Sequence, residues 1–347
     1  MRKFPVPKSR LIDGIEWLGE RVGYPDPMIK GDTFPMTWAD DGEIYTSAGD
    51  PVWSPDEDGL DTEKFVGGPA DYKIWRTNSM KDYVGWGGWG QKPSGMISVE
   101  GTLYLAFQNM LGYKPPAHGG RSQHGSDAGI VLSVDHGATW RPTMKEMQAY
   151  PAQGVMFPGS RFGGPAFVNF GRDNAGAVDD FVYAVSTDQW DNGSELRLGR
   201  VPKDRIMHAS SWQWVGGLDK SGAPKWTSDL EASVPVLVDD RHISLPEMVY
   251  LAGIKRYLLL TWHLKVDFAP AGSDLIVYES PNPWGPFALV HYEELYGGKE
   301  LTMYCPRVPL KWMEPDGVTG WMQHSGSWAP QSPYYRSSVR KFRLKMR

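Results

Sequence analysis

The sequence predicts an all-β protein, a five-bladed β-propeller of four-stranded antiparallel blades closed by an N-terminal strand. With 40 Gly, 28 Pro and 16 Trp among 347 residues, the composition is typical of short strands joined by tight turns and packed through aromatic side chains. A strand, turn and strand pattern recurs along the chain, and the run at 133–140 marks a further turn. Because 41% of the residues are hydrophobic, the chain can bury a large core, and we expect one domain over 1–347.

Each repeat begins with an apolar strand, passes through a turn and continues in a strand built around an aromatic residue. The five segments cover 34–48, 95–107, 165–171 with 181–185, 247–260 and 307–323, and recur about every 60 to 75 residues. Four of the turns contain residues that hairpins favour: Asp41-Gly42, Glu100-Gly101, Gly253 and Asp316-Gly317. This spacing fits five blades, since six or seven would leave too few residues for each.

Outer strands are expected after several of these hairpins. Apolar runs predict them at 128–133 with Trp140, at 196–201 with 212–215, at 274–279 with 287–291, and at 336–344. The segment at 11–18 is expected to supply the missing outer strand of the last blade and so tie the two ends of the chain together. The predicted blades cover approximately 30–92, 93–160, 161–230, 231–300 and 301–347, with the closing strand at 10–20.

The run at 133–140 reads Ser-Val-Asp-His-Gly-Ala-Thr-Trp and has the form S-x-D-x-G-x-T-W. In a turn between two strands, Asp135 can accept backbone N–H groups, Gly137 can take a positive φ, and Trp140 can pack at the start of the next strand. The run resembles the Asp-box of sialidases and related propellers. That resemblance implies a structural turn on the rim away from the catalytic centre, so chemistry is expected at the opposite end of the blades.

Charge and cysteine content exclude several kinds of partner and site. The chain has 36 basic and 41 acidic residues, a net charge of −5 and no Lys/Arg-rich block, which argues against nucleic acid and favours a neutral or weakly charged ligand. Cys305 is the single cysteine, which excludes an intrachain disulfide or a Cys-rich metal site. No apolar run of signal-peptide or membrane-spanning length predicts a membrane partner, and the location expected from the sequence as given is cytoplasmic, or secreted or periplasmic if a leader was removed. The oligomeric state stays open.

The propeller topology selects the candidate site residues. The innermost strand of each blade begins on the face to which the second strand returns, and ligands are expected over the axis of that face. The residues just before the inner strands and just after the second strands are Asp32, Asp50, Asn109, Arg161, Asp188, Trp190, Glu247, His263, Arg307 and His324. Long loops add His118, His124, Trp86 and Trp89. Flat aromatic faces beside polar groups suit sugar rings, so an oligosaccharide or polysaccharide is the expected ligand.

Three runs carry a more specific resemblance: 32–46, 198–206 and 280–287. They look like a group of bacterial propeller proteins that is similar to the furanosidase-type glycosidases, namely arabinanases, β-xylosidases and invertases. The group is also similar to a formerly uncharacterised family now associated with endo-D-arabinanase activity. The resemblance extends from about Leu11 to Leu344. It implies a glycosidase-like propeller with an Asp at the head of the first blade and a Glu on a later one.

Glycoside hydrolysis needs two carboxyl groups beside the scissile bond, one protonated and one ionised. Asp32 and Glu247 occupy positions comparable to the Asp and Glu that the resemblance implies, and Asp50 or Asp188 could modulate a pKa. Burial near the axis would raise the pKa of one carboxyl group. Asp32, Glu247 and Asp188 are therefore the predicted catalytic residues, and the other candidates are predicted to bind substrate.

Two alternatives to a hydrolase remain open. A polysaccharide lyase would abstract a proton beside a uronate carboxylate, for which the rim offers cations and bases: Arg161, Arg307, His263, His324, His118, His124 and Tyr304. A propeller that only binds glycans is the other alternative. The sequence has no His-x-x-x-His pair, EF-hand run or nucleotide-binding loop, so no metal site and no cofactor are predicted, although an axial calcium or sodium ion stays open.

Overall fold

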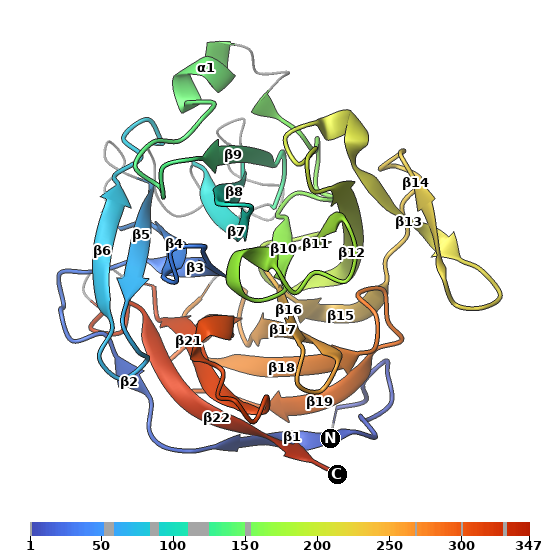
Figure 1. Ribbon diagram of the computed structural model, residues 1–347. Helices are drawn as coiled ribbons and strands as arrows, with labels where there is room; N and C mark the ends of the chain where they lie inside the picture. The colour runs from blue at the N-terminus through green and yellow to red at the C-terminus, as the bar shows by residue number, and fades with distance from the viewer. Residues whose placement is uncertain are drawn as a thin grey trace.

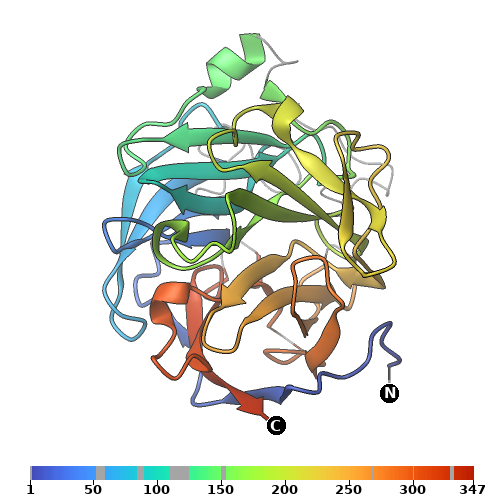
Figure 2. The same ribbon diagram turned by 45° about the vertical axis from the view of Figure 1, so that its right-hand side comes forward.

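The computed structural model describes residues 2–51, 59–83, 90–109, 125–149, 154–267, 269–299, 301–328 and 332–347. Antiparallel strands are arranged around a common centre, and the ends of the chain lie together beside β1 (Figures 1 and 2). The expected all-β propeller is confirmed. Helices are few: α1 (Met144–Ala149) and the 3₁₀ turns η1 (Arg172–Asn174), η2 (Ala209–Ser211) and η3 (Leu310–Trp312).

The strands follow the chain from blade to blade. The first blade contains β3 (Asp32–Trp38), β4 (Ile44–Gly49), β5 (Leu60–Val66) and β6 (Lys73–Asn78). The second contains β7 (Lys92–Val99), β8 (Thr102–Gln108) and β9 (Gly129–Ser133). The third contains β10 (Ala166–Asn169), β11 (Phe181–Thr187), β12 (Gly193–Pro202) and β13 (Gln213–Leu218), with β14 (Pro224–Thr227) and β15 (Leu237–Ile243) added at its outer side.

Two further blades complete the ring. The fourth contains β16 (Glu247–Leu251), β17 (Arg256–Leu264), β18 (Ser273–Ser280) and β19 (Ala288–Glu293). The fifth contains β20 (Met303–Arg307), β21 (Thr319–Gly326) and β22 (Ser338–Met346), with β1 (Ile12–Trp17) on its outer edge and β2 (Val22–Gly23) also pairing with β22. Strand β1 runs antiparallel to β22 from Ile12↔Met346 to Trp17↔Phe342, so the expected closing strand is confirmed.

The innermost strands form a closed ring of neighbours. Strand β3 contacts β7, β7 contacts β10, β16 contacts β20, and β20 contacts β3. Between the third and fourth blades the contact becomes a parallel ladder, with Val168 opposite Met248 and Asn169 opposite Val249. This ring brings the first residues of all five inner strands to one end of the axis.

The second blade differs from the expected four strands. Trp140 was expected to begin an outer strand, but within the described residues the only pairing there is the bridge between Leu132 and Arg141, with N–H to O=C distances of 2.8 and 2.9 Å. Pro142 follows, and because proline has no N–H group it cannot continue the ladder. The chain instead enters α1, where Thr143 and Glu146 form reciprocal side-chain to backbone hydrogen bonds.

The hydrophobic core lies between neighbouring blades. Tyr45, Leu103 and Phe107 pack between the first and second blades, and Leu260, Met322 and Phe342 pack between the fourth and fifth. Strands β16 and β18 are buried on both faces, which explains why each contains a continuous run of apolar residues. In the part of the chain that the structure describes, no helix has the length and apolar character needed to cross a bilayer.

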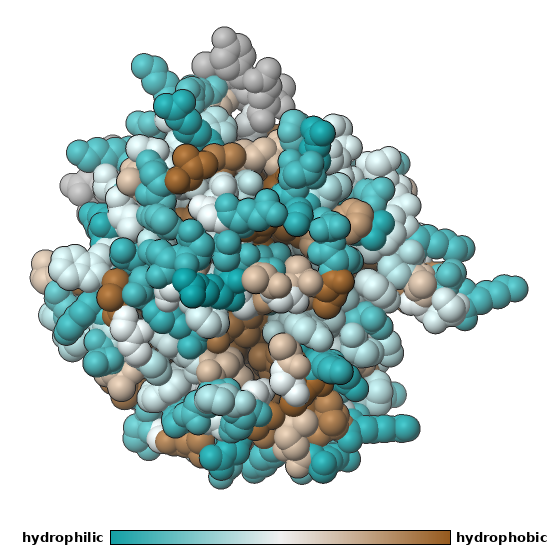
Figure 3. Space-filling view, in the orientation of Figure 1, coloured by the Kyte–Doolittle hydropathy of each residue, from teal (hydrophilic) through white to brown (hydrophobic). Residues whose placement is uncertain are grey.

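The surface seen from the side of Figure 1 is mostly polar. Hydrophobic side chains show mainly in the lower half of this face, around the strands of the fourth and fifth blades (Figure 3). Large hydrophobic residues that are exposed, such as Val22, Trp75 and Val134, come from different blades and do not form one patch by sequence or by sheet. Single exposed hydrophobic residues of this kind are ordinary on soluble surfaces.

Candidate functional site

Three inner strands begin with a charged side chain near one end of the axis, and Arg307, expected just before an inner strand, joins them from the end of one. Asp32 begins β3, Lys92 begins β7, Glu247 begins β16, and Arg307 ends the short strand β20. All four are buried, with Lys92 and Arg307 each only 1% exposed. A buried charge requires a partner of opposite charge or several hydrogen bonds. Burying these four charged side chains together therefore destabilises the fold unless they form ion pairs or hydrogen bonds.

Asp32 lies in a network of polar side chains. The Tyr304 hydroxyl donates a hydrogen bond to Oδ2 of Asp32 over 2.9 Å, while the ammonium group of Lys92 pairs with the carboxylate of Asp50. Burial, followed by the Asp50 charge, raises the pKa of Asp32 to about 7, and Lys92, Tyr304 and Tyr335 partly offset this rise. A carboxyl group with this pKa can exchange a proton near neutral pH.

Glu247 is the second buried carboxyl group at the axis. Its Oε2 accepts the backbone N–H of Val308 over 2.5 Å. Burial raises the pKa of Glu247 to about 7, and the positive charge of Arg307 and the Val308 N–H act in the opposite direction. Glu247 therefore matches Asp32 in its burial and in the direction of its pKa shift.

Arg307 connects the backbone at the two carboxyl groups. Its Nε donates to the carbonyl of Thr33 over 3.0 Å, and its Nη1 donates to the carbonyl of Pro246 over 2.9 Å. Thr33 directly follows Asp32, and Pro246 directly precedes Glu247. The guanidinium group thus fixes the first blade relative to the fourth at the level of both carboxyl groups, as a rigid planar fork can.

Polar side chains with unused hydrogen-bonding capacity surround this centre. Both side-chain amide atoms of Gln108, Nδ2 of Asn109 and Nη2 of Arg307 are buried and have no hydrogen-bond partner among the described residues. Buried polar atoms are nearly always satisfied, so such groups call for an explanation. Gln108 and Asn109 come from the end of β8, which returns to the same face, and can hydrogen-bond a polar ligand.

Other predicted site residues have different surroundings. Asp188 uses Oδ1 to accept the backbone N–H groups of Ser194 and Glu195 over 2.8 and 3.1 Å. Arg161 lies on the exposed surface and pairs with Glu231 over 2.7 Å. These contacts show Asp188 holding the loop after β11 and Arg161 paired with Glu231.

The predicted site residues Trp190 and His324 lie in different surroundings. Trp190 is buried in a cluster with Leu245, Trp262 and Tyr304, beside the axial charges. His324 is completely buried, with Tyr296 at 3.4 Å, and burial lowers its pKa well below the usual range. The structure therefore brings Trp190 to the centre, whereas His324 is an uncharged side chain packed between blades.

His263 lies at the edge of the same face. It is half-buried and stacks on His242 with ring centroids 4.0 Å apart. Burial, followed by the neighbouring His242, lowers the pKa of His263 to about 4. The remaining predicted residues, His118, His124, Trp86 and Trp89, lie outside the described residues.

Sequence reasoning missed three residues of the buried charge network. Lys92 and Tyr335 both act on the pKa of Asp32, and Asp191 is a further buried carboxyl group whose pKa is raised well above its usual range by burial and then by Asp267. Lys92 could have been found from its position at the head of an inner strand, where Asp32 and Glu247 also occur. Asp191 directly follows Trp190, and the sequence has no pattern that distinguishes it from Asp188.

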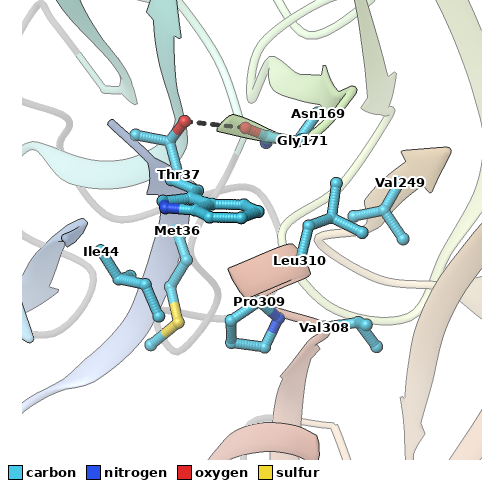
Figure 4. Close-up of a pocket in the computed structure, with 10 residues that line it drawn as sticks. Met36, Thr37, Ile44, Asn169, Gly171, Val249, Val308, Pro309 and Leu310 are labelled. Atoms are coloured by element: carbon cyan, nitrogen blue, oxygen red, sulfur yellow. Dashed lines mark hydrogen bonds between the residues drawn. The ribbon is translucent and has the colours of Figure 1, made fainter. Parts of the chain in front are cut away.

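A small cavity lies at the opposite end of the axis. It is lined by Met36, Thr37, Trp38, Ile44, Asn169, Gly171, Val249, Val308, Pro309 and Leu310 (Figure 4). Its volume of about 10 Å³ accommodates about one water molecule and no sugar ring. Thr37 closes it with a hydrogen bond of 2.9 Å to Asn169. None of these lining residues has an ionisable side chain, so acid–base chemistry is expected at the end where the inner strands begin.

The turn at 133–140 lies toward this opposite end. Asp135 accepts the N–H and hydroxyl of Thr139 over 2.8 and 2.7 Å, and Gly137 has a φ of 83°. His136 reaches the turn between β3 and β4, where it contacts Asp40 over 2.8 Å. Asp135 therefore has the turn-holding contacts that the sequence suggested.

Comparison with solved structures agrees with the fold. A candidate hydrolase from Bacteroides ovatus is 12% identical with a TM-score of 0.54, and the match covers 93% of this chain and 87% of that one. A protein of unknown function from Dyadobacter fermentans is 12% identical with a TM-score of 0.52, covering 96% and 100%. An α-L-arabinanase from Cellvibrio cellulosa, solved with arabinohexaose, is 10% identical with a TM-score of 0.52, covering 92% and 96%. At these identities the likeness concerns the fold alone.

The sequence itself gives one clear family assignment. No curated protein matches it. Residues 27–297 match the family described as a domain of unknown function, DUF4185. This match covers most of the chain and includes Asp32, Asp50, Lys92 and Glu247, so the protein belongs to the DUF4185 family.

Proposed function

We propose that this protein is a glycoside hydrolase that cleaves a glycosidic bond in an oligosaccharide or polysaccharide. The observation that carries the proposal is the pair of buried carboxyl groups, Asp32 and Glu247, which begin two inner strands and are linked through the contacts of Arg307. The pKa of each is raised to about 7. Glycoside hydrolysis needs such a pair because one group must donate a proton while the other is ionised.

The surroundings of the two groups suggest different roles. Tyr304 and Lys92 both favour the ionised form of Asp32, so Asp32 is proposed as the base or nucleophile. Glu247 is proposed as the acid, because burial keeps a proton on it near neutral pH. Asp50 acts on the pKa of Asp32 and is proposed as the modulating carboxylate, whereas Asp188 accepts the backbone of its own loop.

The proposed substrate is a sugar chain that lies across the face where the inner strands begin. Gln108, Asn109 and Arg307 can hydrogen-bond sugar hydroxyls with the atoms that have no partner among the described residues. Trp190 lies beside them and contributes apolar surface. The arabinohexaose bound by the Cellvibrio arabinanase makes arabinose polymers a suitable first substrate to test.

The test is a screen of plant, algal and mycobacterial polysaccharides in which reducing ends and product sizes are measured. We expect Asp32→Asn and Glu247→Gln each to reduce hydrolysis by about 1000-fold or more while the protein remains folded. The exposed carboxyl group of Asp204 provides the control, since Asp204→Asn should retain full activity. Full activity in both site variants would contradict the assignment of the pair.

The same screen distinguishes the other two functions. A lyase would release unsaturated uronates that absorb in the ultraviolet, and a binding protein would retain glycans without any product. Tyr304, the tyrosine base that a lyase could use at this site, donates its hydroxyl proton toward Asp32 and has a pKa raised well above the usual range. Since a tyrosine with that pKa is a poor base near neutral pH, a hydrolase is the better supported function.

A further inference from the structure

Two histidines and an aspartate meet where the third blade adjoins the fourth. His242 comes from β15, His263 from β17 and Asp274 from β18. His263 and Asp274 are opposite each other in the ladder between β17 and β18, and β15 packs against β17. One side-chain ligand atom from each of the three residues lies within 4.8 Å of the other two.

Backbone carbonyl groups orient both imidazole rings. Nδ1 of His242 is 2.5 Å from the carbonyl oxygen of Asp240, and Nδ1 of His263 is 2.8 Å from that of Arg241. A carbonyl oxygen can only accept a hydrogen bond, so each Nδ1 carries the proton and each Nε2 keeps its lone pair. Histidines that ligate metals show this arrangement, in which the second ring nitrogen is held by a carbonyl or carboxylate.

Asp274 retains capacity to act as a ligand. Its Oδ2 accepts hydrogen bonds from Lys265 and from the hydroxyl of Tyr292, both over 2.8 Å, whereas among the described residues Oδ1 accepts only the N–H of Leu295 over 2.9 Å. A carboxylate oxygen has two lone pairs, so Oδ1 can accept one more contact. Lys265 also reaches Glu294 over 3.0 Å, which gives its ammonium group a second anionic partner.

The ligand types select the class of ion. Two imidazole nitrogens and one carboxylate oxygen suit zinc and similar divalent transition metals, with water completing a four-coordinate site. Calcium and magnesium prefer oxygen ligands throughout. Ligand atoms in a tetrahedral zinc site lie about 3.3 Å apart, so groups within 4.8 Å of one another would have to move closer by about 1.5 Å at most.

We propose that His242, His263 and Asp274 form a binding site for a divalent transition metal ion of the zinc type. The bound ion joins β15 of the third blade to β17 and β18 of the fourth. Both histidines are only half-buried, so an ion can enter from solvent. The site does not depend on the proposed hydrolase activity, because it uses none of the axial carboxyl groups.

The test uses the full chain after treatment with a chelator. Zinc chloride is titrated by calorimetry, and copper(II) is added separately so that electron paramagnetic resonance can report nitrogen ligands. The site variants are His242→Gln and His263→Gln. Two histidine variants serve as controls: His208→Gln removes an exposed histidine outside any such group, and His136→Gln disrupts the only other described cluster of this kind, formed with Asp40 and Asp41.

We expect one equivalent of zinc to bind, with the copper spectrum showing nitrogen ligation. Each site variant should weaken zinc binding at least about 10-fold, while both controls should match the original chain. Zinc should also raise the unfolding temperature of the original chain and of both controls but not of the site variants. Absence of zinc binding at millimolar concentration, or loss of binding in His136→Gln with retention in His263→Gln, would overturn the proposal.

Discussion

The hydroxyl group of Tyr304 donates a hydrogen bond to the carboxylate of Asp32 across the joint between the fifth and first blades. The donor and acceptor are 272 residues apart in the sequence and 2.9 Å apart in the structure. This bond stabilises the ionised form of Asp32 and so works against the rise in its pKa that burial produces. The pKa of Asp32 therefore depends on the closure of the ring.

Tyr304→Phe should raise the pKa of Asp32 further, because the variant removes a donor that favours the carboxylate. If ionised Asp32 acts in catalysis, the acidic limb of kcat/KM will move to higher pH by about 1 unit, as expected for one hydrogen bond to a charged group. The measurement is a pH profile on the substrate found in the screen. Tyr334→Phe, at an exposed neighbouring tyrosine, is the control and should leave the limb in place.

Lys92→Met should destabilise the fold by about 3 to 5 kcal/mol, because it leaves the Asp50 carboxylate without its buried cation. Lys92 and Asp50 have side chains only 1% and 2% exposed, so water cannot replace the lost partner easily. The coupling energy comes from urea unfolding of three variants: Lys92→Met, Asp50→Leu and the double variant that carries both substitutions. Strictly additive losses would show that the two side chains do not stabilise each other.

Asp32 and Glu247 should make stability depend on pH. Their folded-state pKa values of about 7 exceed their ordinary values of 3.8 and 4.5, so between those limits the folded protein holds protons that the unfolded chain releases. Stability therefore falls as pH rises through this window, by about 4 kcal/mol for Asp32 and about 3 kcal/mol for Glu247.

The combined variant with Asp32→Asn and Glu247→Gln lacks both titrating groups. Urea unfolding measures the difference in free energy of unfolding between this variant and the original chain. That difference should shift in favour of the variant as the pH rises from 4.5 to 8. The free energy of unfolding of Asp204→Asn should change with pH in the same way as that of the original chain over the same range. A constant difference between the combined variant and the original chain would mean that the two pKa values are not raised by folding.

Asp188→Ala should lower the free energy of unfolding by about 1 to 2 kcal/mol, since the variant removes the acceptor for the N–H groups of Ser194 and Glu195. The midpoint of the acidic limb of kcat/KM should stay unchanged, because Asp50 is the carboxylate that acts on Asp32. A shift of that midpoint without a loss of stability would instead assign the modulating role to Asp188.

The position of Asp32 and Glu247 could be predicted from the sequence because a simple topological rule selects the heads of the inner strands. Lys92 follows the same rule but was missed. Lysine is normally a surface residue, and no sequence pattern around Lys92 indicates that it forms a buried ion pair. Arg307 contacts Thr33, which is 274 positions away in the sequence, and Pro246, which is 61 positions away. No local sequence pattern predicts such contacts. Local rules thus placed the two carboxyl groups at the starts of inner strands, whereas the side chains around them depend on long-range pairing.

The outer edge of the second blade, as far as the structure describes it, shows a second limit of prediction from sequence. Periodicity correctly predicted β9, but the effect of Pro142 on the next strand depends on where a ladder bond would be needed. The group of His242, His263 and Asp274 was likewise hidden, because its spacing matches no metal motif and is created by strand register. In both cases the sequence determines the outcome through pairing that only the assembled sheet makes visible.

Because β1 pairs with β22, the ring cannot close before β22 has been synthesised. Strand β1 is translated early, yet its ladder with β22 requires residues up to Met346. Until then β1 and β21 each lack the strand they pair with, and their unpaired edges expose the nascent protein to edge-to-edge association. A ribosome that stops before β22 would therefore release an open ring, so we expect prematurely terminated chains to be recognised and degraded rather than to persist as partly active protein.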